Sequence, residues 1–528
     1  MNDNPQPPSR TEFSVALAAL AALAFLPAIG CGWVNWDDDI NFLDNPDFGG
    51  LGLPGLAWAW KARVLGVFQP WSWLLLEAEY SAWGLKPFGY HALSLALHSA
   101  NTVALFRVIS SLMGRARGVP DGPEVRWAAA ISSALWAIHP LRAEVVSWTS
   151  CQPYLPSILC SLLAILAYLR AQDGRPRRAA WLGLSLGLYG SAVLFKGIAV
   201  TLPFVLMILD RYPLRRQGLR PWLEKLPFLG IGLAIAVIGL RSRGAEQAPW
   251  MDRLASSGYS AWFYPIKTLA PIGLTVAYPV PSGNESGWVG LVAVVLATVL
   301  ACGLRRRFPG LPACWLAYLI VLAPNSGLVE SHRDTIACDR YAYASTMPLF
   351  VGLAAALSRL PAAGRFRTRA SFAGLAAIVL VVLSWDQSAS WKSSVTLYSR
   401  AEARGNAASH LIQNNLGEAL FEQGHAREAL DHDRRASDLQ PHRPRPYFNV
   451  GVLCASLGRD DDAGRWFAEA LRRNPHYLPA RYAVERLRAD GILTAPLPGV
   501  TDGEPTGPSS EDRDLTLWGA SHDREVPP

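Results

Sequence analysis

Three consecutive carboxylates, Asp37, Asp38 and Asp39, follow closely after an uncharged apolar run at 13–29. A carboxylate beside a lipid surface is costly unless it is solvated, paired or used in chemistry. An Asp at such a place could deprotonate an acceptor hydroxyl, or help to hold a divalent cation on a diphosphate. Both tasks suit a substrate with a polar headgroup on a lipid tail. The alternative is a solvated turn, which Asn45–Pro46 favours.

A lipid-linked phosphate would also need cations nearby. The candidates for binding it are Lys196, Arg340, Lys267 and His139, and the candidates for supporting roles are Asp339, Tyr341 and Glu144. We expect all of them on the same side of the membrane as the three aspartates.

Each of these residues also has a purely structural interpretation. Lys196 could extend its charge to the interface from an otherwise apolar helix. Arg340 could pair with its neighbour Asp339, and Glu144 could pair with Arg142. His139 could cap a helix terminus before Pro140.

The composition is that of a membrane protein. Hydrophobic residues make up 51% of the 528 residues and charged residues 17%, whereas soluble proteins carry about 25% charged residues. The 20 tryptophans fit the aromatic belts found at bilayer interfaces. The formal charge of +7 comes from arginine clusters between apolar runs, so it does not indicate nucleic-acid binding.

The apolar runs predict about eleven membrane spans. They lie at 13–32, 89–112, 127–139, 154–170, 179–195, 197–210, 226–241, 287–304, 311–324, 341–357 and 370–385. The first run is longer than the apolar core of a signal peptide, so we expect it to be retained as a helix. We therefore expect an all-α fold with a polytopic helix bundle over residues 13–385.

The arginine-rich loops give the predicted orientation. Arginines cluster at 115–126, 170–178, 211–225, 305–307 and 359–369. Cytoplasmic loops are enriched in Arg and Lys, so these loops place residues 1–12 in the cytoplasm and the first loop, 33–88, outside it. The short loops favour a bacterial inner membrane, with the C-terminal region in the periplasm.

Two further segments are apolar without being good spans. Residues 68–85 contain Glu77 and Glu79, and residues 259–281 contain Lys267 and several prolines. We expect both to be helices that lie in the membrane interface or re-enter the bilayer, near the loop that carries the three aspartates.

A repeat with a period of 34 residues begins after the last span. Gly417 and Gly451 are 34 residues apart, as are Pro441 and Pro475. This period and its small residues are typical of the tetratricopeptide repeat, a helix–turn–helix unit. We expect a short α-solenoid at 386–490, with repeats near 410–443 and 444–477 and a capping helix at 478–490. The Pro-, Gly- and acid-rich tail at 491–528 is predicted to be disordered.

The seven cysteines have neither disulfide nor metal-ligand spacing, so we interpret them as small hydrophobic residues. The sequence indicates no certain cofactor and leaves a divalent cation open.

Six segments in order carry a family resemblance. They are "WVNWDDDINFLDNP", "PWSWLLLEAEYSAWGLKPFGYHALSLALHSANTVALF", "ALWAIHPLRAEVVSW", "FKGIAVTLPFVLMILDRYPLRR", "YPIKTLAPIGLTVAYPVP" and "DRYAYASTMPLF". Followed by tetratricopeptide repeats, they resemble the transmembrane and tetratricopeptide repeat-containing family. The resemblance covers roughly residues 13–490.

The resemblance implies a glycosyltransferase of the GT-C fold, similar to protein O-mannosyltransferases. Such an enzyme would take a sugar from a polyprenyl phosphate and transfer it to a hydroxyl of a protein, peptide or glycan acceptor. The acidic motif of the first external loop maps onto Asp37, Asp38 and Asp39, with Asp38 and Asp39 as the preferred candidates for the base and Asp37 as the next. Lys196 and Arg340 would hold the donor phosphate.

The sequence departs from the family pattern at two places. Gln69 stands before Pro70 where the family commonly has His, and the stretch 149–157 has no charge where the family commonly has Glu-Arg-Lys-Asp. These departures bear on specificity and activity.

Two other classes of function stay open. The chain could be a non-enzymatic scaffold that recruits partners through its repeats, although an anchor needs only one span. It could also be a transporter, but the spans show no internal repeat of the kind that transporters often have.

Overall fold

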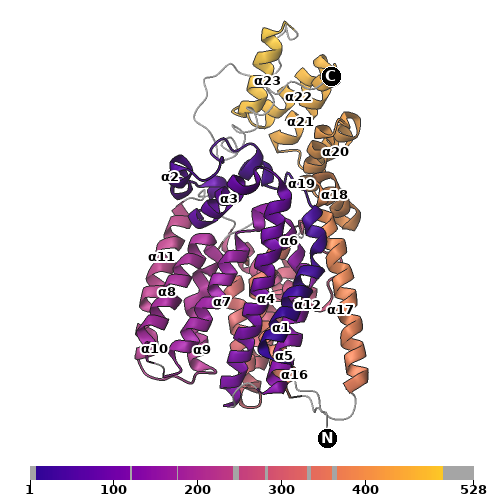
Figure 1. Ribbon diagram of the computed structural model, residues 1–528. Coiled ribbons are helices and arrows are strands. Elements are labelled where there is room, and N and C mark those ends of the chain that lie inside the picture. Colours follow the sequence, from indigo (N-terminus) through magenta and orange to yellow (C-terminus); the bar gives the residue numbers. More distant parts are fainter. Residues whose placement is uncertain are drawn as a thin grey trace. The chain divides into compact units, whose positions relative to one another are not determined.

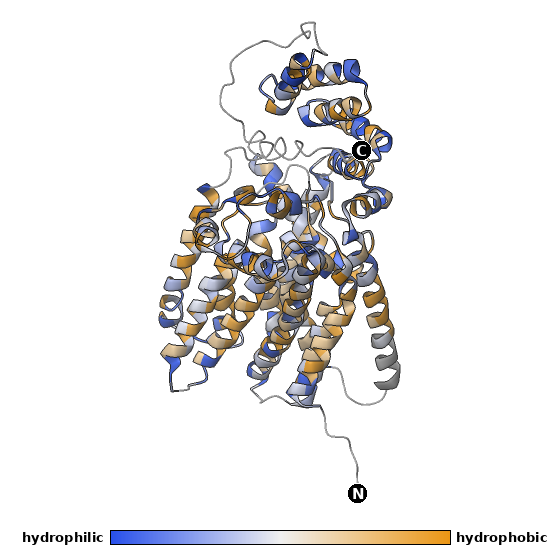
Figure 2. Cartoon of the chain, turned by 45° about the horizontal axis from the view of Figure 1, so that its top comes forward, coloured by the Kyte–Doolittle hydropathy of each residue, from blue (hydrophilic) through white to orange (hydrophobic). Residues whose placement is uncertain are grey.

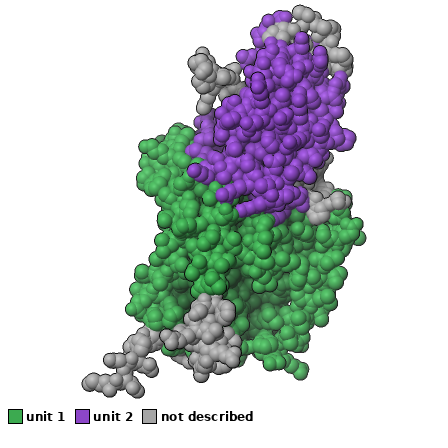
Figure 3. Space-filling view, turned by 90° about the vertical axis from the view of Figure 1, so that its right-hand side faces the viewer, with its two compact units in different colours: residues 1–32, 49–274, 280–391 green, residues 33–48, 275–279, 392–528 purple. Residues whose placement is uncertain are grey.

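The computed structural model describes residues 8–118, 122–174, 176–241, 249–279, 283–329, 335–359 and 366–491, with backbone alone at 366–373. Within these ranges the regular elements are all helices, which confirms the all-α prediction (Figure 1). The chain divides into two compact units, coloured separately in Figure 3. Unit 1 comprises 1–32, 49–274 and 280–391, and unit 2 comprises 33–48, 275–279 and 392–528.

Unit 1 is a helix bundle. Its α-helices are α1 (Arg10–Ala24), α2 (Leu53–Lys61), α3 (Pro70–Trp83), α4 (Pro87–Arg117), α5 (Pro123–Ala137), α6 (Ala143–Ser147), α7 (Tyr154–Ala171), α8 (Arg178–Phe195), α9 (Leu202–Arg211), α10 (Arg220–Leu223), α11 (Leu226–Arg241), α12 (Trp250–Leu269), α13 (Glu285–Gly303), α14 (Gly310–Leu322), α15 (Ala342–Ser345), α16 (Met347–Leu357) and α17 (Phe366–Ala389). Short turns join them, of which η4 (Pro140–Arg142), η6 (Gly197–Thr201) and η9 (Asp339–Tyr341) bear on the site.

Each predicted span coincides with helical structure in unit 1. Among the described residues, six helical segments are long and apolar enough to cross a membrane: Pro87–Arg117, Thr149–Ala171, Arg178–Phe195, Arg220–Arg241, Glu285–Arg306 and Gly374–Lys392. Two shorter apolar helices lie at Gly310–Asn325 and Met347–Leu357. Figure 2 shows the apolar residues distributed along the bundle helices. The predicted total of about eleven spans stays a prediction.

The long helix α4 organises the bundle by packing against α1, α5 and α7. Pro87 begins it, where the missing N–H costs nothing, and Gly118 ends it in the left-handed conformation. Two polar side chains on its buried face have partners inside the bundle. His98 Nδ1 is 2.8 Å from the Tyr343 hydroxyl, and Asn101 Nδ2 donates to Leu155 O over 3.0 Å. These contacts tie α4 to α7 and α15.

Unit 2 contains helical hairpins at the positions of the sequence repeats. Its helices are α18 (Ser394–Ala401), α19 (His410–Glu422), α20 (Ala426–Leu439), α21 (Pro444–Ser456), α22 (Asp460–Arg473) and α23 (Leu478–Ala489). Gly424 and Gly458 have φ values of 82° and 70° in the turns between paired helices, which favours glycine. A Cβ on Gly451 would lie 2.5 Å from the Phe467 ring, so the 34-residue spacing also reflects close helix packing.

Residues 33–48 belong to unit 2, whereas the sequence boundaries assigned them to the membrane domain. The reason is a set of contacts with α18, which follows the last membrane helix. Asn35 N donates to Ser394 Oγ over 3.0 Å, and the Tyr398 hydroxyl donates to Asn35 O over 3.0 Å. The Trp36 and Tyr398 ring centroids are 6.2 Å apart. The predicted disordered tail after residue 491 lies outside the described residues.

Candidate functional site

The three aspartates of the acidic loop have different surroundings. Asp37 has a φ of 115°, which is uncommon for a residue with a side chain and stores backbone strain. Asp38 is fully buried, and its Oδ2 accepts the Val34 N–H over 3.1 Å. Asp39 begins a short π-helical turn, Asp39–Leu43, and its carbonyl accepts the Asp44 N–H over 2.9 Å. Asp38 therefore folds the loop that presents Asp39.

Asp39 is a carboxylate of this loop whose proton affinity is raised by its surroundings. Burial, followed by the nearby charge of Glu418, raises the pKa of Asp39 to about 6. Its Oδ1 atom is buried without a hydrogen-bond partner among the described residues. A carboxyl group with this pKa is mostly ionised at neutral pH and is a stronger base than an ordinary aspartate.

The repeat helices contribute a polar cluster to the same unit. Glu418 of α19 pairs with Arg445 of α21, with 3.1 Å between Oε2 and Nη2. Asn449 Nδ2 donates to Asn414 Oδ1 over 3.1 Å, which joins the same two helices. Asp39 lies within electrostatic range of both Glu418 and Arg445. The first repeat and the acidic loop thus share one charged region within unit 2.

In unit 1, Arg340 and Glu144 form a buried ion pair. Arg340 Nη1 is 2.5 Å from Glu144 Oε1, and the Arg340 backbone N–H donates to Oε2 over 2.9 Å. The Glu144 side chain is 2% exposed and that of Arg340 is 18% exposed. The guanidinium carbon also lies 5.4 Å from the Trp148 ring centroid. One carboxylate therefore fixes both the backbone and the side chain of Arg340.

The sequence offered two structural alternatives, an Arg340–Asp339 pair and a Glu144–Arg142 pair. The observed Glu144–Arg340 pair differs from both. Glu144 pairs with Arg340, which is 196 residues away, instead of with Arg142. Arg142 is fully buried and donates to Trp136 O, Ala342 O and Thr346 Oγ1. Arg142 consequently joins α5 to α15 as a structural residue.

Lys196 stands at the junction between α8 and the turn η6. Its Nζ donates to Gln69 Oε1 over 2.9 Å and lies 5.3 Å from the Tyr154 ring centroid. Tyr154 is also within electrostatic range of Arg340 and Glu144, and Cys151 is within range of all three charges. The structure thus brings Lys196, Arg340 and Glu144 around the start of α7.

The remaining candidates in unit 1 occupy different positions. Lys267 Nζ donates to Ile272 O over 2.6 Å, and burial lowers the pKa of Lys267 while Asp339 opposes this effect. Asp339 and Tyr341 are buried in η9 on either side of Arg340. His139 uses both ring nitrogens, one 3.0 Å from Thr268 O and the other accepting the Leu141 N–H. His139 caps η4, as its structural interpretation predicted.

An apolar cavity of about 700 Å³ lies within unit 1. Its wall includes Ile198 and Thr201 of η6, which follow Lys196 in the sequence, and Ala344, which follows Arg340. The rest of its wall comes mainly from α4, α7, α9, α14 and α16. A cavity of this size and lining fits an apolar chain.

Two residues that the sequence reasoning did not select meet in a buried polar contact. Gln152 Nε2 donates to Glu79 Oε1 over 3.0 Å and also to Tyr90 O over 2.9 Å. Burial raises the pKa of Glu79 to about 8, so this acid is mainly protonated at neutral pH. The sequence held one indication of these contacts. Gln69 and Gln152 both lie where the chain departs from the family pattern. They contact Lys196 and Glu79 respectively.

The candidate residues therefore form two groups. Asp37, Asp38 and Asp39 belong to unit 2, while the cations and Glu144 belong to unit 1. Among the described residues, no group of three or more His, Cys, Asp or Glu side chains is arranged to hold a metal ion.

Comparison with known proteins gives relatives of one kind. Protein O-mannosyl-transferase Tmtc3 of Drosophila melanogaster is 24% identical over 490 residues, covering 78% of this chain and 52% of the relative. Protein O-mannosyl-transferase TMTC3 of Homo sapiens is 22% identical over 473 residues, covering 80% and 50%. Protein O-mannosyl-transferase Tmtc1 of Drosophila melanogaster is 30% identical over 192 residues, covering 35% and 21%. No family model matches the chain.

The chain spans about half the length of the TMTC3 relatives that it matches. Together with the apolar helices, these matches identify a multi-pass membrane protein. They confirm the resemblance found in the sequence: the chain is related to the protein O-mannosyl-transferases of the transmembrane and tetratricopeptide repeat-containing family.

Proposed function

We propose that this protein is an integral-membrane glycosyltransferase that moves a sugar from a polyprenyl phosphate to a hydroxyl group of a protein. The names of its relatives support transfer of a sugar to protein. The apolar cavity is the observation that supports a lipid-linked donor. Part of its wall comes from η6, and the first residue of η6 follows Lys196 in the sequence. Such an apolar space, with a cation next to part of its wall in the sequence, suits a phosphate attached to a long hydrocarbon chain.

The donor would be held by unit 1. Its hydrocarbon chain would occupy the apolar cavity, and its phosphate would lie at Lys196 and Arg340. These two cations are held in place before any substrate binds, by Gln69 and Glu144 respectively. Fixed charges stabilise a departing phosphate without further rearrangement, which is an electrostatic contribution to the transition state.

The acceptor would react at the acidic loop. Its hydroxyl oxygen would attack the anomeric carbon, the bond from that carbon to the phosphate oxygen would break, and the hydroxyl proton would pass to Asp39. A base with a pKa near 6 takes this proton more readily than an ordinary aspartate does. Because the loop and the repeats belong to one unit, we infer that the repeats hold the acceptor protein.

The predicted topology completes the proposal. The arginine-rich loops would face the cytoplasm, and transfer would take place on the opposite side of the membrane. In a bacterial inner membrane that side is the periplasm.

A reconstituted transfer assay tests the donor site. The full chain in lipid nanodiscs would be given a radiolabelled polyprenyl-phosphate mannose and a serine- and threonine-rich peptide. We expect labelled peptide from the wild type and a loss of about 10²-fold or more for Lys196→Gln, since a fixed charge on the leaving group typically contributes this much. Lys61→Gln, which removes an exposed lysine of unit 1, is the matched control and should transfer normally.

Equal transfer by Lys196→Gln and Lys61→Gln would remove Lys196 from the donor site. No transfer by the wild type with any polyprenyl-phosphate sugar, together with partner binding that depends on residues 410–489, would favour the scaffold alternative.

A further inference from the structure

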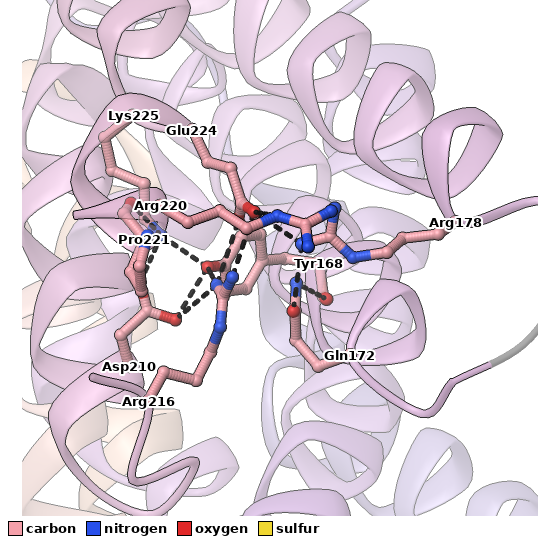
Figure 4. Close-up of polar contacts among 9 residues, drawn as sticks. All are labelled: Tyr168, Gln172, Arg178, Asp210, Arg216, Arg220, Pro221, Glu224 and Lys225. Atoms are coloured by element: carbon pink, nitrogen blue, oxygen red, sulfur yellow. Dashed lines mark hydrogen bonds and ion pairs between the residues drawn. The ribbon is translucent and has the colours of Figure 1, made fainter. Parts of the chain in front are cut away.

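A network of charged side chains lies at one end of unit 1, where α7 ends, α8 begins and α9 passes into α10 and α11 (Figure 4). Arg216 bridges two acids, with Nη1 3.0 Å from Asp210 Oδ1 and Nη2 2.9 Å from Glu224 Oε1. Lys225 is fully buried and contacts Asp210 and the Tyr168 hydroxyl. Arg178 reaches Glu224 from α8 at 2.5 Å. The loop between α9 and α11 is thereby fixed to α7 and α8.

The network leaves a surplus of positive charge at this end. The two loops, 170–178 and 210–225, contain nine basic and three acidic residues. Asp210 and Glu224 are engaged inside the network, and Asp173 pairs with Arg115 at 2.5 Å. Arg220 lies 3.5 Å from Glu224 at the edge of the network, and Arg177, Arg211 and Arg215 are also exposed, so the surface arginines outnumber the acids that could neutralise them.

Large apolar side chains are exposed beside these arginines. Leu219, Trp222, Leu223 and Leu226 are 69%, 58%, 52% and 58% exposed, and Arg220 lies among them with its side chain 75% exposed. Most of them lie in the first part of the candidate span Arg220–Arg241, in which Leu226 begins α11. Tryptophan and leucine next to arginine at the end of a span are typical of the zone where acyl chains meet headgroups.

We propose that this surface, formed by residues 211–226, binds the phosphate headgroup of an anionic membrane lipid such as phosphatidylglycerol. Trp222 and the leucines would lie among the acyl chains, while Arg215 and Arg220 would contact the phosphate. Apolar contacts and charge favour the same ligand, whereas a soluble phosphate would satisfy only the charge. The buried contacts of Lys225 and Arg216 keep the loop in place, so little ordering is needed on binding.

Native mass spectrometry of the delipidated full chain in detergent tests this site. Phosphatidylglycerol would be titrated against the wild type and the double variant Arg215→Gln/Arg220→Gln. Each arginine near an anionic lipid contributes about 1 kcal/mol, so the double variant should bind about 30-fold more weakly. The matched control is Arg305→Gln/Arg306→Gln, which removes two exposed arginines from another loop and should bind like the wild type.

Three results would overturn the proposal. Retention of phosphatidylglycerol by the double variant at the control's level would exclude these arginines. Equal retention of zwitterionic phosphatidylcholine would exclude recognition of charge. Displacement of the lipid by millimolar inorganic phosphate would indicate a site for soluble phosphate. Because the residues lie outside the proposed transfer site, sugar transfer by the double variant can be measured separately.

Discussion

The acidic loop and the Glu144–Arg340 centre both hold carboxylates away from solvent, but the charges that surround these carboxylates differ. Glu144 accepts two N–H groups from one arginine residue, so its charge is matched at short range. Asp39 has the acid Glu418 as its principal charged neighbour, and burial adds to the cost of ionising it. The first arrangement pairs a carboxylate with a cation at hydrogen-bond distance, and the second raises the affinity of a carboxylate for a proton.

This difference assigns different tasks to Glu144 and Asp39. The sequence alone presents both only as members of one set of charged candidate residues. A matched carboxylate is suited to positioning, because neither its charge nor its hydrogen bonds are available to a substrate. A carboxylate with a raised pKa is suited to accepting a proton. Glu144 therefore positions Arg340, whereas Asp39 is the candidate for chemistry.

The largest effect should follow from removing the proposed base. Asp39→Asn should lower the rate of sugar transfer by about 10²- to 10⁴-fold, because general base catalysis contributes about that much. The measurement is the transfer assay with a saturating donor, accompanied by gel filtration to show that the variant is folded.

Two matched variants sharpen this prediction. Asp47→Asn makes the same change at an exposed position of the same loop and should leave the rate unaltered. Asp38→Asn retains an oxygen that can accept the Val34 N–H, so it should lose less activity than Asp39→Asn. Full activity in Asp39→Asn, or a greater loss in Asp38→Asn, would reverse the roles assigned to the two residues.

The helices could be predicted from the sequence more completely than the contacts between distant residues. Apolar runs and the 34-residue period locate the helices, because burial in lipid and helix–helix packing impose local periodicity on the sequence. The Glu144–Arg340 pair and the Asn35–Ser394 contact join residues 196 and 359 positions apart, and no local pattern encodes them. The positions of Gln69 and Gln152 were visible only as departures from a family pattern, without their partners.

The second prediction concerns the matched carboxylate. Arg340→Met should destabilise unit 1 by about 3–5 kcal/mol, because it leaves Glu144 buried without its cation. The double variant Glu144→Gln/Arg340→Met should recover part of this loss, since no charge then stays buried. Thermal unfolding in detergent measures both variants.

The control for this prediction is an exposed pair in the same unit. Arg117 and Glu124 are 3.5 Å apart, with side chains 34% and 71% exposed. Arg117→Met should cost less than about 1 kcal/mol. If Arg340→Met were no more destabilising than Arg117→Met, the centre would not depend on its ion pair.

The smallest expected effect is a dependence of stability on pH that originates at Asp39. Its pKa is about 6 in the folded chain, against an ordinary value of 3.8. The folded state therefore binds more protons than the unfolded state between about pH 4 and pH 6. Stability from this group is complete below that range and is lost as the pH rises through it, by about 3 kcal/mol in total. Asp39→Asn removes the ionisation, so its melting temperature should exceed that of the wild type by more at pH 7 than at pH 4.5. An equal difference at both pH values would mean that Asp39 has an ordinary pKa, and the distinction between the two carboxylates would then fail.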